Sequence, residues 1–381
     1  MKVILNVDAI TAPLTGIGRY ALELARGLAI HPAITDLRLY SAYQWVEKPE
    51  DALRSNRTIA LLRRRIPFRT HALELYARGR SALFNFHTRR LDGFLLHTPN
   101  YVLMPFDGPA ISTVHDLSWL SYPETHPIER VRFLERHLPR TLERATHVLT
   151  DSQFVADELV DQLHVPRDKV RVVPLGVDPS FRPYAADDLT PILSRYGLQA
   201  GGYTLVVATL EPRKNLMCLA RAFAALPTEL RQRFPLVIVG GRGWLGKDLG
   251  RMLTALEASG GARRLGYVAE TDLPMVYAGA RAFAFPSLYE GFGLPVLEAM
   301  ACGVPALTSN ASSLPEVAGN AALLVDPLDE TAISDGLRKL LDDADWRSSA
   351  IAAGLARASE FTWQRCVQNT VSVYQEAFAQ T

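Results

Sequence analysis

Hydrophobic and polar residues follow two repeating patterns along this chain. Short runs of β-branched and other apolar residues, typical of buried strands, alternate with longer segments that have helical spacing. In the first half, strands are predicted at 3–8, 37–41, 94–97, 111–115, 147–150 and 170–173, and helices at 18–29, 128–144 and 153–163. Strands that alternate with helices indicate a parallel, doubly wound sheet.

The pattern pauses once and then begins again. Residues 174–198 contain four prolines among mixed polar residues, which predicts a connector. Beyond it, strands are predicted at 203–209, 236–240, 263–267, 281–285, 304–308 and 322–325, and the chain from 330 to 381 is predicted to be helical throughout. The expected fold is therefore α/β, with two Rossmann-like domains of doubly wound parallel sheet, 1–185 and 186–361, that face a central cleft, followed by a last helix at 362–381.

Length and composition restrict the class of protein. A chain of 381 residues can form two domains that each bury a core, and 48% hydrophobic residues with a net charge of +1 describe a globular protein with no nucleic-acid partner. No apolar run approaches the roughly 20 residues needed to cross a bilayer. The N-terminal apolar run is interrupted by Asp8, so it predicts a first strand rather than a signal peptide. Three scattered cysteines without metal-ligand spacing are interpreted as reduced core thiols of a cytoplasmic protein.

The segment 286–303 contains the most specific chemical signal. Glu290 and Glu298 lie eight positions apart, around a glycine-rich turn that leads from a strand into a helix. Ligands of parallel sheets bind beyond the carboxyl ends of the strands, and free N–H groups at a helix start suit phosphate. Those N–H groups belong to Phe292, Gly293 and Leu294. Because carboxylates accept hydrogen bonds from hydroxyls, Glu298 is predicted to hold a ribose and Glu290 the sugar that is moved; an ordinary helix start with two solvated glutamates is the alternative.

A second signal follows the first strand of the second half. The segment 210–215 contains Arg213 and Lys214, and a doubly wound sheet would aim both cations at the phosphates held by the Glu290 loop. Arginine offers a bidentate fork and lysine a compact charge, which suits a diphosphate leaving group. The alternative is a solvated pair at a helix start, where positive charge is mildly unfavourable.

The segment with two glutamates resembles the Glu-x7-Glu signature of retaining, nucleotide-sugar-dependent glycosyltransferases with the GT-B fold (glycosyltransferase family 4), a family that includes bacterial mannosyltransferases. The resemblance implies that Arg213 and Lys214 bind the diphosphate and that Glu290 is a substrate ligand. It also implies an acceptor-side first domain, a nucleotide-sugar-binding second domain, and a last helix that crosses back to the first. With two cations on the diphosphate, neither a metal nor another cofactor is expected to be required.

The first domain offers two further matches to this family and one set of candidate acceptor residues. The segment 15–20 resembles its glycine loop, which implies Gly16 near the donor phosphates and Arg19 as a phosphate or acceptor ligand; a turn with a surface arginine is the alternative. His115 ends a predicted strand where the family places a histidine against the donor sugar, and a histidine satisfied in the core is the alternative. The residues that end the preceding strand are predicted acceptor contacts, with plain loop structure as the other interpretation. These residues are His97, Asn100 and Tyr101.

Three other segments add less specific predictions. The segment 265–270 resembles the place where backbone groups, including those of Val268, meet the nucleobase, and 240–243 is a tight turn predicted to face the cleft. Between Arg54 and Arg80 there are eight arginines and a single acid. Contact with anionic lipid, a lid over the acceptor and a solvated surface all stay open for this stretch.

The predicted function is retaining transfer of a hexose to a glycan or lipid-linked acceptor in polysaccharide biosynthesis, in the cytoplasm or at the inner face of the cytoplasmic membrane. The segments 16–20 and 114–119 look most like bacterial mannosyltransferases, which favours GDP-mannose as donor over a UDP- or dTDP-sugar. A dinucleotide-dependent oxidoreductase would need Gly-x-Gly-x-x-Gly, and Ala21 breaks that motif. A non-catalytic sugar-nucleotide sensor remains as the third hypothesis.

Overall fold

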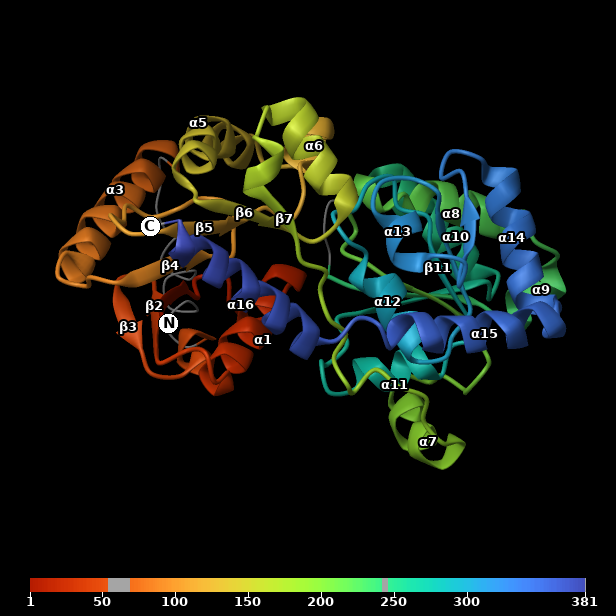
Figure 1. Ribbon diagram of the computed structural model, residues 1–381. Helices are drawn as coiled ribbons and strands as arrows, with labels where there is room; N and C mark the ends of the chain where they lie inside the picture. The colour runs from red at the N-terminus through yellow and green to blue at the C-terminus, as the bar shows by residue number, and fades with distance from the viewer. Residues whose placement is uncertain (54–68, 242–245, 381) are drawn as a thin grey trace. The chain divides into compact units, whose positions relative to one another are not determined.

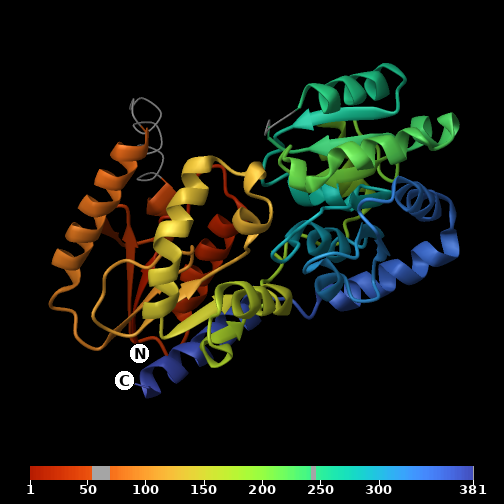
Figure 2. The same cartoon turned by 90° about the horizontal axis from the view of Figure 1, so that it is seen from above.

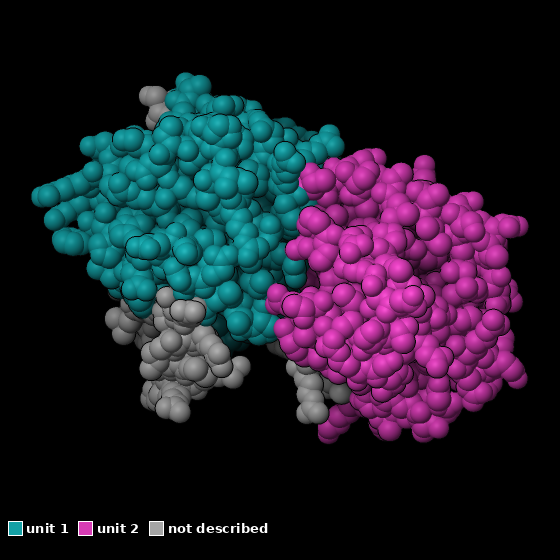
Figure 3. Space-filling model, turned by 90° about the horizontal axis from the view of Figure 1, so that it is seen from below, with its two compact units in different colours: residues 1–176, 363–381 teal, residues 177–362 magenta. Residues whose placement is uncertain are grey.

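The chain forms two compact units, coloured separately in Figure 3. The computed structural model describes residues 1–53, 69–241 and 246–380. Unit 1 comprises residues 1–176 together with 363–381, and unit 2 comprises 177–362. The first boundary therefore lies before the position 185 derived from the sequence. Residues just beyond it belong to unit 2 because Phe181 packs edge-on against Tyr277, with ring centroids 5.4 Å apart.

Unit 1 is built on a seven-stranded sheet with the order β3-β2-β1-β4-β5-β6-β7. Figures 1 and 2 show this unit from two directions, with helices around the sheet. Its strands are β1 (Lys2–Asn6), β2 (Asp36–Ser41), β3 (Gln44–Val46), β4 (Phe94–Thr98), β5 (Ala110–Thr113), β6 (His147–Thr150) and β7 (Val170–Val172). Every neighbouring pair is parallel except β2 with β3. Strands β4, β5 and β6 are buried along their whole length, as strands covered on both faces must be.

The helices of unit 1 are α1 (Gly16–Ile30), α3 (Arg69–Thr88), α4 (Ser118–Ser121), α5 (Ile128–Arg144), α6 (Gln153–Leu163) and α16 (Trp363–Ala379), with 3-10 turns η1 (Pro123–Thr125) and η2 (Arg167–Lys169). Helix α1 begins where the Thr15 hydroxyl accepts a hydrogen bond from the Gly18 N–H at 3.2 Å, the usual satisfaction of a free helix-start donor. Its buried face carries Tyr20, Leu24 and Leu28 into the core.

Unit 2 contains a six-stranded parallel sheet with the order β10-β9-β8-β11-β12-β13. The strands are β8 (Thr204–Val207), β9 (Leu236–Val239), β10 (Ala262–Gly266), β11 (Ala282–Phe285), β12 (Ala306–Ser309) and β13 (Leu323–Val325). The chain builds outward from β8 to β10 and then returns to place β11 on the other side of β8. The carboxyl ends of β8 and β11 thus form the topological switch point, where ligands of such sheets bind.

Helices connect the strands of unit 2 and complete its layers. They are α7 (Ala186–Arg195), η3 (Pro212–Lys214), α8 (Leu216–Ala224), α9 (Thr228–Arg233), α10 (Lys247–Ala258), α11 (Leu273–Ala278), α12 (Leu294–Ala301), α13 (Leu314–Ala318), α14 (Glu330–Asp342) and α15 (Ala344–Ala358). A cluster of buried aliphatic and aromatic side chains, with Leu219, Phe223 and Leu337 among its members, forms the core between the sheet and helices α8 and α14.

The last helix, α16, belongs to unit 1, where it packs beside α1 (Figure 1). Its exposed flank bonds to unit 1 through Gln368, whose side-chain oxygen lies 3.0 Å from His31 Nε2, and through Glu376, which accepts from Arg171 at 2.8 Å. Its buried face carries Tyr374 into the core. Unit 1 is consequently assembled from both ends of the chain.

The α/β fold is as predicted, and several local features differ. Helix α3 was not among the predicted helices. The three-residue strand β3 was not expected. The proline-rich connector contains helix α7, which tolerates Pro191 while it buries Leu189 and Leu193. The C-terminal region is not one continuous helical stretch, because it breaks between α15 and α16, where Thr362 forms a parallel bridge with Val177.

Two predictions fall on residues that the structure leaves out. Most of the arginine-rich segment lies in 54–68 and half of the turn 240–243 lies in 242–245, both outside the described residues. Lipid contact by that segment therefore stays a prediction. Within 1–53, 69–241 and 246–380, no helix has the length and apolar character needed to cross a membrane.

Candidate active site

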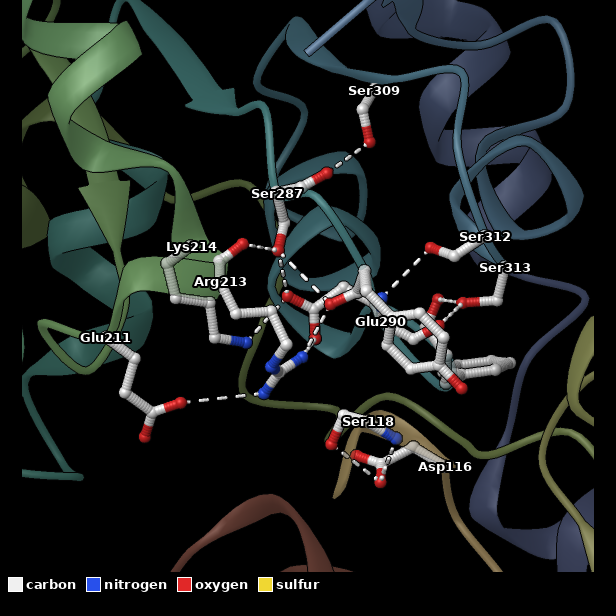
Figure 4. Close-up of polar contacts among 12 residues, drawn as sticks. Asp116, Ser118, Glu211, Arg213, Lys214, Ser287, Glu290, Ser309, Ser312 and Ser313 are labelled. Carbon is white, nitrogen blue, oxygen red and sulfur yellow. Dashed lines mark hydrogen bonds and ion pairs between the residues drawn. The ribbon is translucent and has the colours of Figure 1, made fainter. Parts of the chain in front are cut away.

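The predicted donor-site residues of unit 2 meet at the switch point of its sheet (Figure 4). Strand β8 leads into the short turn η3, which carries Arg213 and Lys214. Strand β11 leads into the loop that carries Glu290. Because β8 and β11 are adjacent, Lys214 and Arg213 contact Glu290, although they lie 76 and 77 positions before it in the sequence.

Glu290 is the centre of this cluster and is 7% exposed. Its Oε1 accepts hydrogen bonds from Lys214 Nζ at 2.6 Å and from the Ser287 hydroxyl at 2.7 Å. Its Oε2 accepts from Arg213 Nη1 at 3.2 Å. Arg213 also donates to the Tyr289 carbonyl at 2.5 Å, which fixes the guanidinium in the loop. The arrangement is a buried, charge-assisted network in which one carboxylate joins two cations.

The charges in this cluster change the proton affinities of its members. Burial favours the neutral carboxyl of Glu290, but the charges of Lys214 and Arg213 outweigh it and hold the pKa of Glu290 below its ordinary value. For Lys214, burial dominates, assisted by the like charge of Arg213, and lowers the pKa of the ammonium despite the opposing effect of Glu290. Removing one member of such a network would leave its partner buried without compensation, which typically costs about 3–5 kcal/mol.

A layer of serine hydroxyls holds the Glu290 loop in place (Figure 4). The Ser313 hydroxyl lies 2.8 Å from the carbonyl oxygens of both Glu290 and Phe292, and the Ser312 hydroxyl accepts from the Glu290 N–H at 2.9 Å. The Ser309 hydroxyl donates to the Ser287 carbonyl at 2.6 Å. No motif marks these serines, because hydroxyls at the end of β12 and in the segment after it acquire their role only from tertiary contact.

Helix α12 begins at this loop and presents free backbone donors. The N–H groups of Gly293 and Leu294 donate to no acceptor within the part of the chain that the structure describes, and the next residue is a proline without an N–H. Such a helix start favours an anion. Phe292 is buried against Phe361, with centroids 5.7 Å apart. Glu298 lies in the second turn of α12 and is 9% exposed.

Gly293 is required by the geometry of this turn. Its φ of 116° lies in the region that side chains other than glycine rarely adopt, and a Cβ there would lie 2.7 Å from Leu314 Cδ2. We therefore expect Gly293→Ala to lower the free energy of unfolding by about 1–3 kcal/mol, measured as a decrease in the denaturant midpoint. The control is Gly79→Ala in the middle of α3, where a Cβ meets nothing within 4 Å and stability should be unchanged or slightly higher. Equal stability of the two variants would contradict the strain argument.

Val268, the residue assigned to the nucleobase segment, follows β10 and is buried at 3% exposure. Its neighbour Tyr267 is 60% exposed. Gly266, the last residue of β10, has a positive φ of 71°, which lets the chain turn before these two residues. The structure therefore places this segment at the carboxyl edge of the same sheet as Glu290, two strands away from β8.

In unit 1, the glycine loop and His115 lie at the carboxyl edge of the other sheet. Gly16 is the first residue of α1, and Arg19 lies partly exposed in its first turn. His115 follows β5 and is 7% exposed. Its Nδ1 lies 2.7 Å from Asp151 Oδ2, and its Nε2 lies 3.0 Å from the Pro99 carbonyl oxygen. Asp151, which follows β6, was not predicted from the sequence.

His97 is a core residue, which corrects its prediction as an acceptor contact. It is completely buried, with Nδ1 2.6 Å from the Tyr374 hydroxyl of α16 and Nε2 2.8 Å from the Thr113 hydroxyl. Burial lowers the pKa of His97 to about 3, so the ring is neutral. The sequence could not show this, because the partner that fills the site is 277 residues away in the chain.

The other two predicted acceptor residues differ in their surroundings. Asn100 is exposed and remains available to a ligand. Tyr101 is buried, and its hydroxyl donates to Asp116 Oδ1 at 2.7 Å. Its φ of 56° is unusual for an aromatic residue and shows that the loop after β4 is held in a defined conformation. Among the described residues, no group of three or more His, Cys, Asp or Glu side chains has the arrangement of a metal site.

Comparison with known proteins identifies the family of this chain. Two family models match the chain, Glycosyltransferase Family 4 over residues 14–181 and Glycosyl transferases group 1 over residues 199–357. O-antigen chain mannosyltransferase B of Escherichia coli is 40% identical over 382 residues, which cover 98% of this chain and 99% of the relative.

Solved structures show the same fold at low identity. Sucrose-phosphate synthase of Thermosynechococcus elongatus matches with a TM-score of 0.76 and 20% identity over 100% of both chains. HepE of Anabaena, solved with UDP-glucose, matches with a TM-score of 0.73 and 16% identity over 99% of this chain and 100% of that one. Together with the family models and the bacterial relative, these matches place the chain in glycosyltransferase family 4, and the protein is a glycosyltransferase with the GT-B fold.

Proposed function

We propose that this protein is a retaining mannosyltransferase that uses GDP-mannose and extends a glycan in polysaccharide biosynthesis. The observation that carries the proposal is the cluster of Arg213, Lys214 and Glu290 at the switch point of unit 2, beside the free N–H groups of α12. The choice of mannose is supported by the name of the Escherichia coli relative, a mannosyltransferase that matches along nearly the whole chain.

In this proposal the diphosphate of the donor binds to Arg213, Lys214 and the N–H groups of Gly293 and Leu294. Fixed positive groups aimed at the leaving oxygen stabilise the charge that develops there, which is usually the largest contribution to catalysis. These groups neutralise the leaving diphosphate, so the proposed reaction requires no metal ion or other cofactor. A diphosphate would compete with Glu290 for both cations, because Glu290 contacts both of them at 2.6 and 3.2 Å.

The two glutamates have separate proposed roles. Glu290, released from its cations, accepts hydrogen bonds from hydroxyls of the transferred sugar, while Glu298 binds the ribose of the nucleotide. Backbone groups at Val268 meet the base, and Phe292 supports the loop. Retention follows if the acceptor attacks on the face that the diphosphate leaves, with the leaving phosphate oxygen taking the proton of the acceptor hydroxyl. The glycosidic bond to the phosphate breaks, and the new one forms to the acceptor oxygen.

Unit 1 provides the proposed contacts to the donor sugar and the acceptor. His115 and Gly16 are assigned to the donor, and Arg19 and Asn100 to the acceptor glycan, while the buried Tyr101 holds the loop that carries Asn100. The name of the Escherichia coli relative points to a growing polysaccharide chain as acceptor. Attachment of that glycan to a lipid, and contact of the protein with the inner face of the cytoplasmic membrane, are part of the same proposal.

The main alternative is the same chemistry with another nucleotide. HepE was solved with UDP-glucose, although at 16% identity it supports the fold alone. Transfer assays with GDP-mannose, UDP-glucose and a dTDP-sugar, each with a mannose-terminated oligosaccharide, distinguish these donors. Transfer only from GDP-mannose, with the anomeric configuration retained, is the expected result, and turnover of only a UDP- or dTDP-sugar would reject the GDP-mannose assignment.

The ribose assignment makes a separate prediction. Glu298→Gln removes the negative charge but keeps the shape of the side chain, so GDP should bind about tenfold more weakly, which corresponds to the loss of one charge-assisted hydrogen bond of roughly 1.5 kcal/mol. Calorimetric titration with GDP measures this change. The matched control is Glu316→Gln on the short helix α13, which should bind GDP as the wild type does. Unchanged GDP affinity in Glu298→Gln would remove the ribose role.

A further inference from the structure

Two buried histidines of unit 1 have opposite hydrogen-bonding partners. His97 lies between two hydroxyls, of Tyr374 and Thr113. A hydroxyl can either donate or accept, so a neutral imidazole satisfies both contacts. His115 lies instead between the carboxylate of Asp151 and the backbone carbonyl of Pro99. Both of these groups accept only, so the ring satisfies both contacts when each nitrogen carries a proton.

The surroundings of His115 support the charged form. Burial alone would favour a neutral ring, but the Asp151 carboxylate, the Pro99 carbonyl and Asp116 together raise the pKa of His115 above its ordinary value. Burial also raises the pKa of the Asp151 carboxyl. The proton goes to the imidazole, because imidazole is ordinarily the stronger base of the two.

The remaining groups around His115 do not oppose this charge strongly. Tyr20 of α1 packs edge-on against the ring with centroids 5.1 Å apart, and Tyr101 lies at 6.4 Å. Burial keeps the pKa of Tyr20 well above its ordinary value, so it is a neutral phenol. His97 adds no charge of its own, because burial and then the charge of His115 lower its pKa to about 3. The Arg130 guanidinium lies on the other side of this group, 5.9 Å from the Tyr101 ring centroid.

We propose that Asp151 is a positioning residue that holds His115 as an oriented imidazolium ion throughout the neutral pH range. This inference rests on the proposed role of His115 toward the donor sugar. It assigns His115 a fixed positive charge rather than proton transfer, because a ring with both N–H groups engaged has neither a free lone pair nor a free donor to exchange. The charge would favour the anionic donor and the developing negative charge of the leaving group.

The linkage of this charge to stability has a definite sign. Because the pKa of His115 is higher in the folded protein than in the unfolded chain, its stabilising contribution is complete below about pH 6.5 and is lost as the pH rises through the folded value. Asp151→Asn should remove most of that contribution. The stability difference between wild type and Asp151→Asn should therefore be larger at pH 6 than at high pH.

The direct test is nuclear magnetic resonance of the protein labelled with ¹⁵N in its histidine rings. In the wild type, both ring nitrogens of His115, assigned with a His115→Gln variant, should stay protonated at pH 7.5. In Asp151→Asn the ring should lose a proton at a lower pH than in the wild type. A neutral His115 ring in the wild type at pH 7, or an unchanged titration in Asp151→Asn, would overturn the proposal. The wild-type spectrum decides even if the variant does not fold.

A kinetic readout tests whether the charge is used. For each unit by which the pKa of His115 lies below the assay pH, the charged fraction of the ring falls about tenfold. Activity is therefore expected to decrease between pH 6 and pH 8.5 at least about tenfold more in Asp151→Asn than in the wild type. The control is Asp157→Asn on α6, an exposed residue that pairs with Arg167 at 2.5 Å and should follow the wild-type pH profile. Parallel pH profiles for Asp151→Asn and wild type would overturn the positioning role. Absence of transfer by the wild type would count against the proposed function, while the ring spectrum would still test the charge on His115.

Discussion

Lys214→Met should lower the rate of sugar transfer by about two to three orders of magnitude. Methionine keeps most of the length and apolar surface of lysine but has no charge, so the variant removes a cation that we propose binds the leaving diphosphate. It also leaves the buried Glu290 with Arg213 as its remaining cation, and the pKa of Glu290 should rise because the charge of Lys214 is the largest effect that lowers it. Steady-state kinetics at saturating donor measures the rate.

The controls separate catalysis from folding. Lys247→Met removes an exposed lysine at the start of α10 in the same unit and should transfer sugar at the wild-type rate. The thermal midpoints of both variants show whether unit 2 is folded. If Lys214→Met is folded and transfers sugar as fast as the wild type, Lys214 does not stabilise the leaving group.

Glu290→Gln should reduce transfer at least about a hundredfold while GDP affinity stays equal or increases. The amide cannot replace the carboxylate as a strong acceptor for sugar hydroxyls, which reduces transfer. The contacts of Arg213 and Lys214 to the Glu290 oxygens are charge-assisted, so a neutral amide binds both cations less strongly. The diphosphate of GDP then has less competition for these cations. The effect on GDP affinity is thus opposite to that expected for Glu298→Gln, which should weaken GDP binding. Calorimetry and initial-rate assays on the two variants measure both quantities.

The wild type should also show the pH dependence that belongs to Glu290. Its pKa is lower in the folded protein than in the unfolded chain, so its stabilising contribution is present above about pH 4.5 and is lost as the pH falls through the folded value. The stability difference between wild type and Glu290→Gln should therefore shrink in acid. A Glu290→Gln protein that binds GDP poorly but transfers sugar normally would contradict the division of roles between the two glutamates.

The pattern of apolar runs predicted most of the two sheets, because a parallel strand covered on both faces must be almost wholly hydrophobic. It missed β3, since the three residues Gln44–Val46 form a strand only through antiparallel pairing with β2. It also missed α7, because the prolines of the connector indicate an irregular segment although Leu189 and Leu193 have helical spacing. Tertiary context decided both.

The same contrast holds for the site. The sequence predicts Arg213, Lys214 and Glu290 close together, because residues that follow neighbouring parallel strands lie at the same edge of a sheet. Asp151 and Ser313 were not found, although each bonds directly to a predicted residue. A single aspartate or serine has no spacing that marks it, and its importance depends on which side chain it reaches in three dimensions. For His97 the same limit caused an error, since Tyr374 supplies its partner from the far end of the chain.

The assembly of unit 1 from both ends of the chain has a practical consequence for work with fragments. A gene fragment that stops near Gly176 would lack α16, so it would expose to water the side of α1 that packs against α16 and would leave His97 without its Tyr374 partner. Such a fragment should aggregate, whereas a circularly permuted gene that joins α16 directly to Met1 through a short linker would encode the whole unit in one continuous piece.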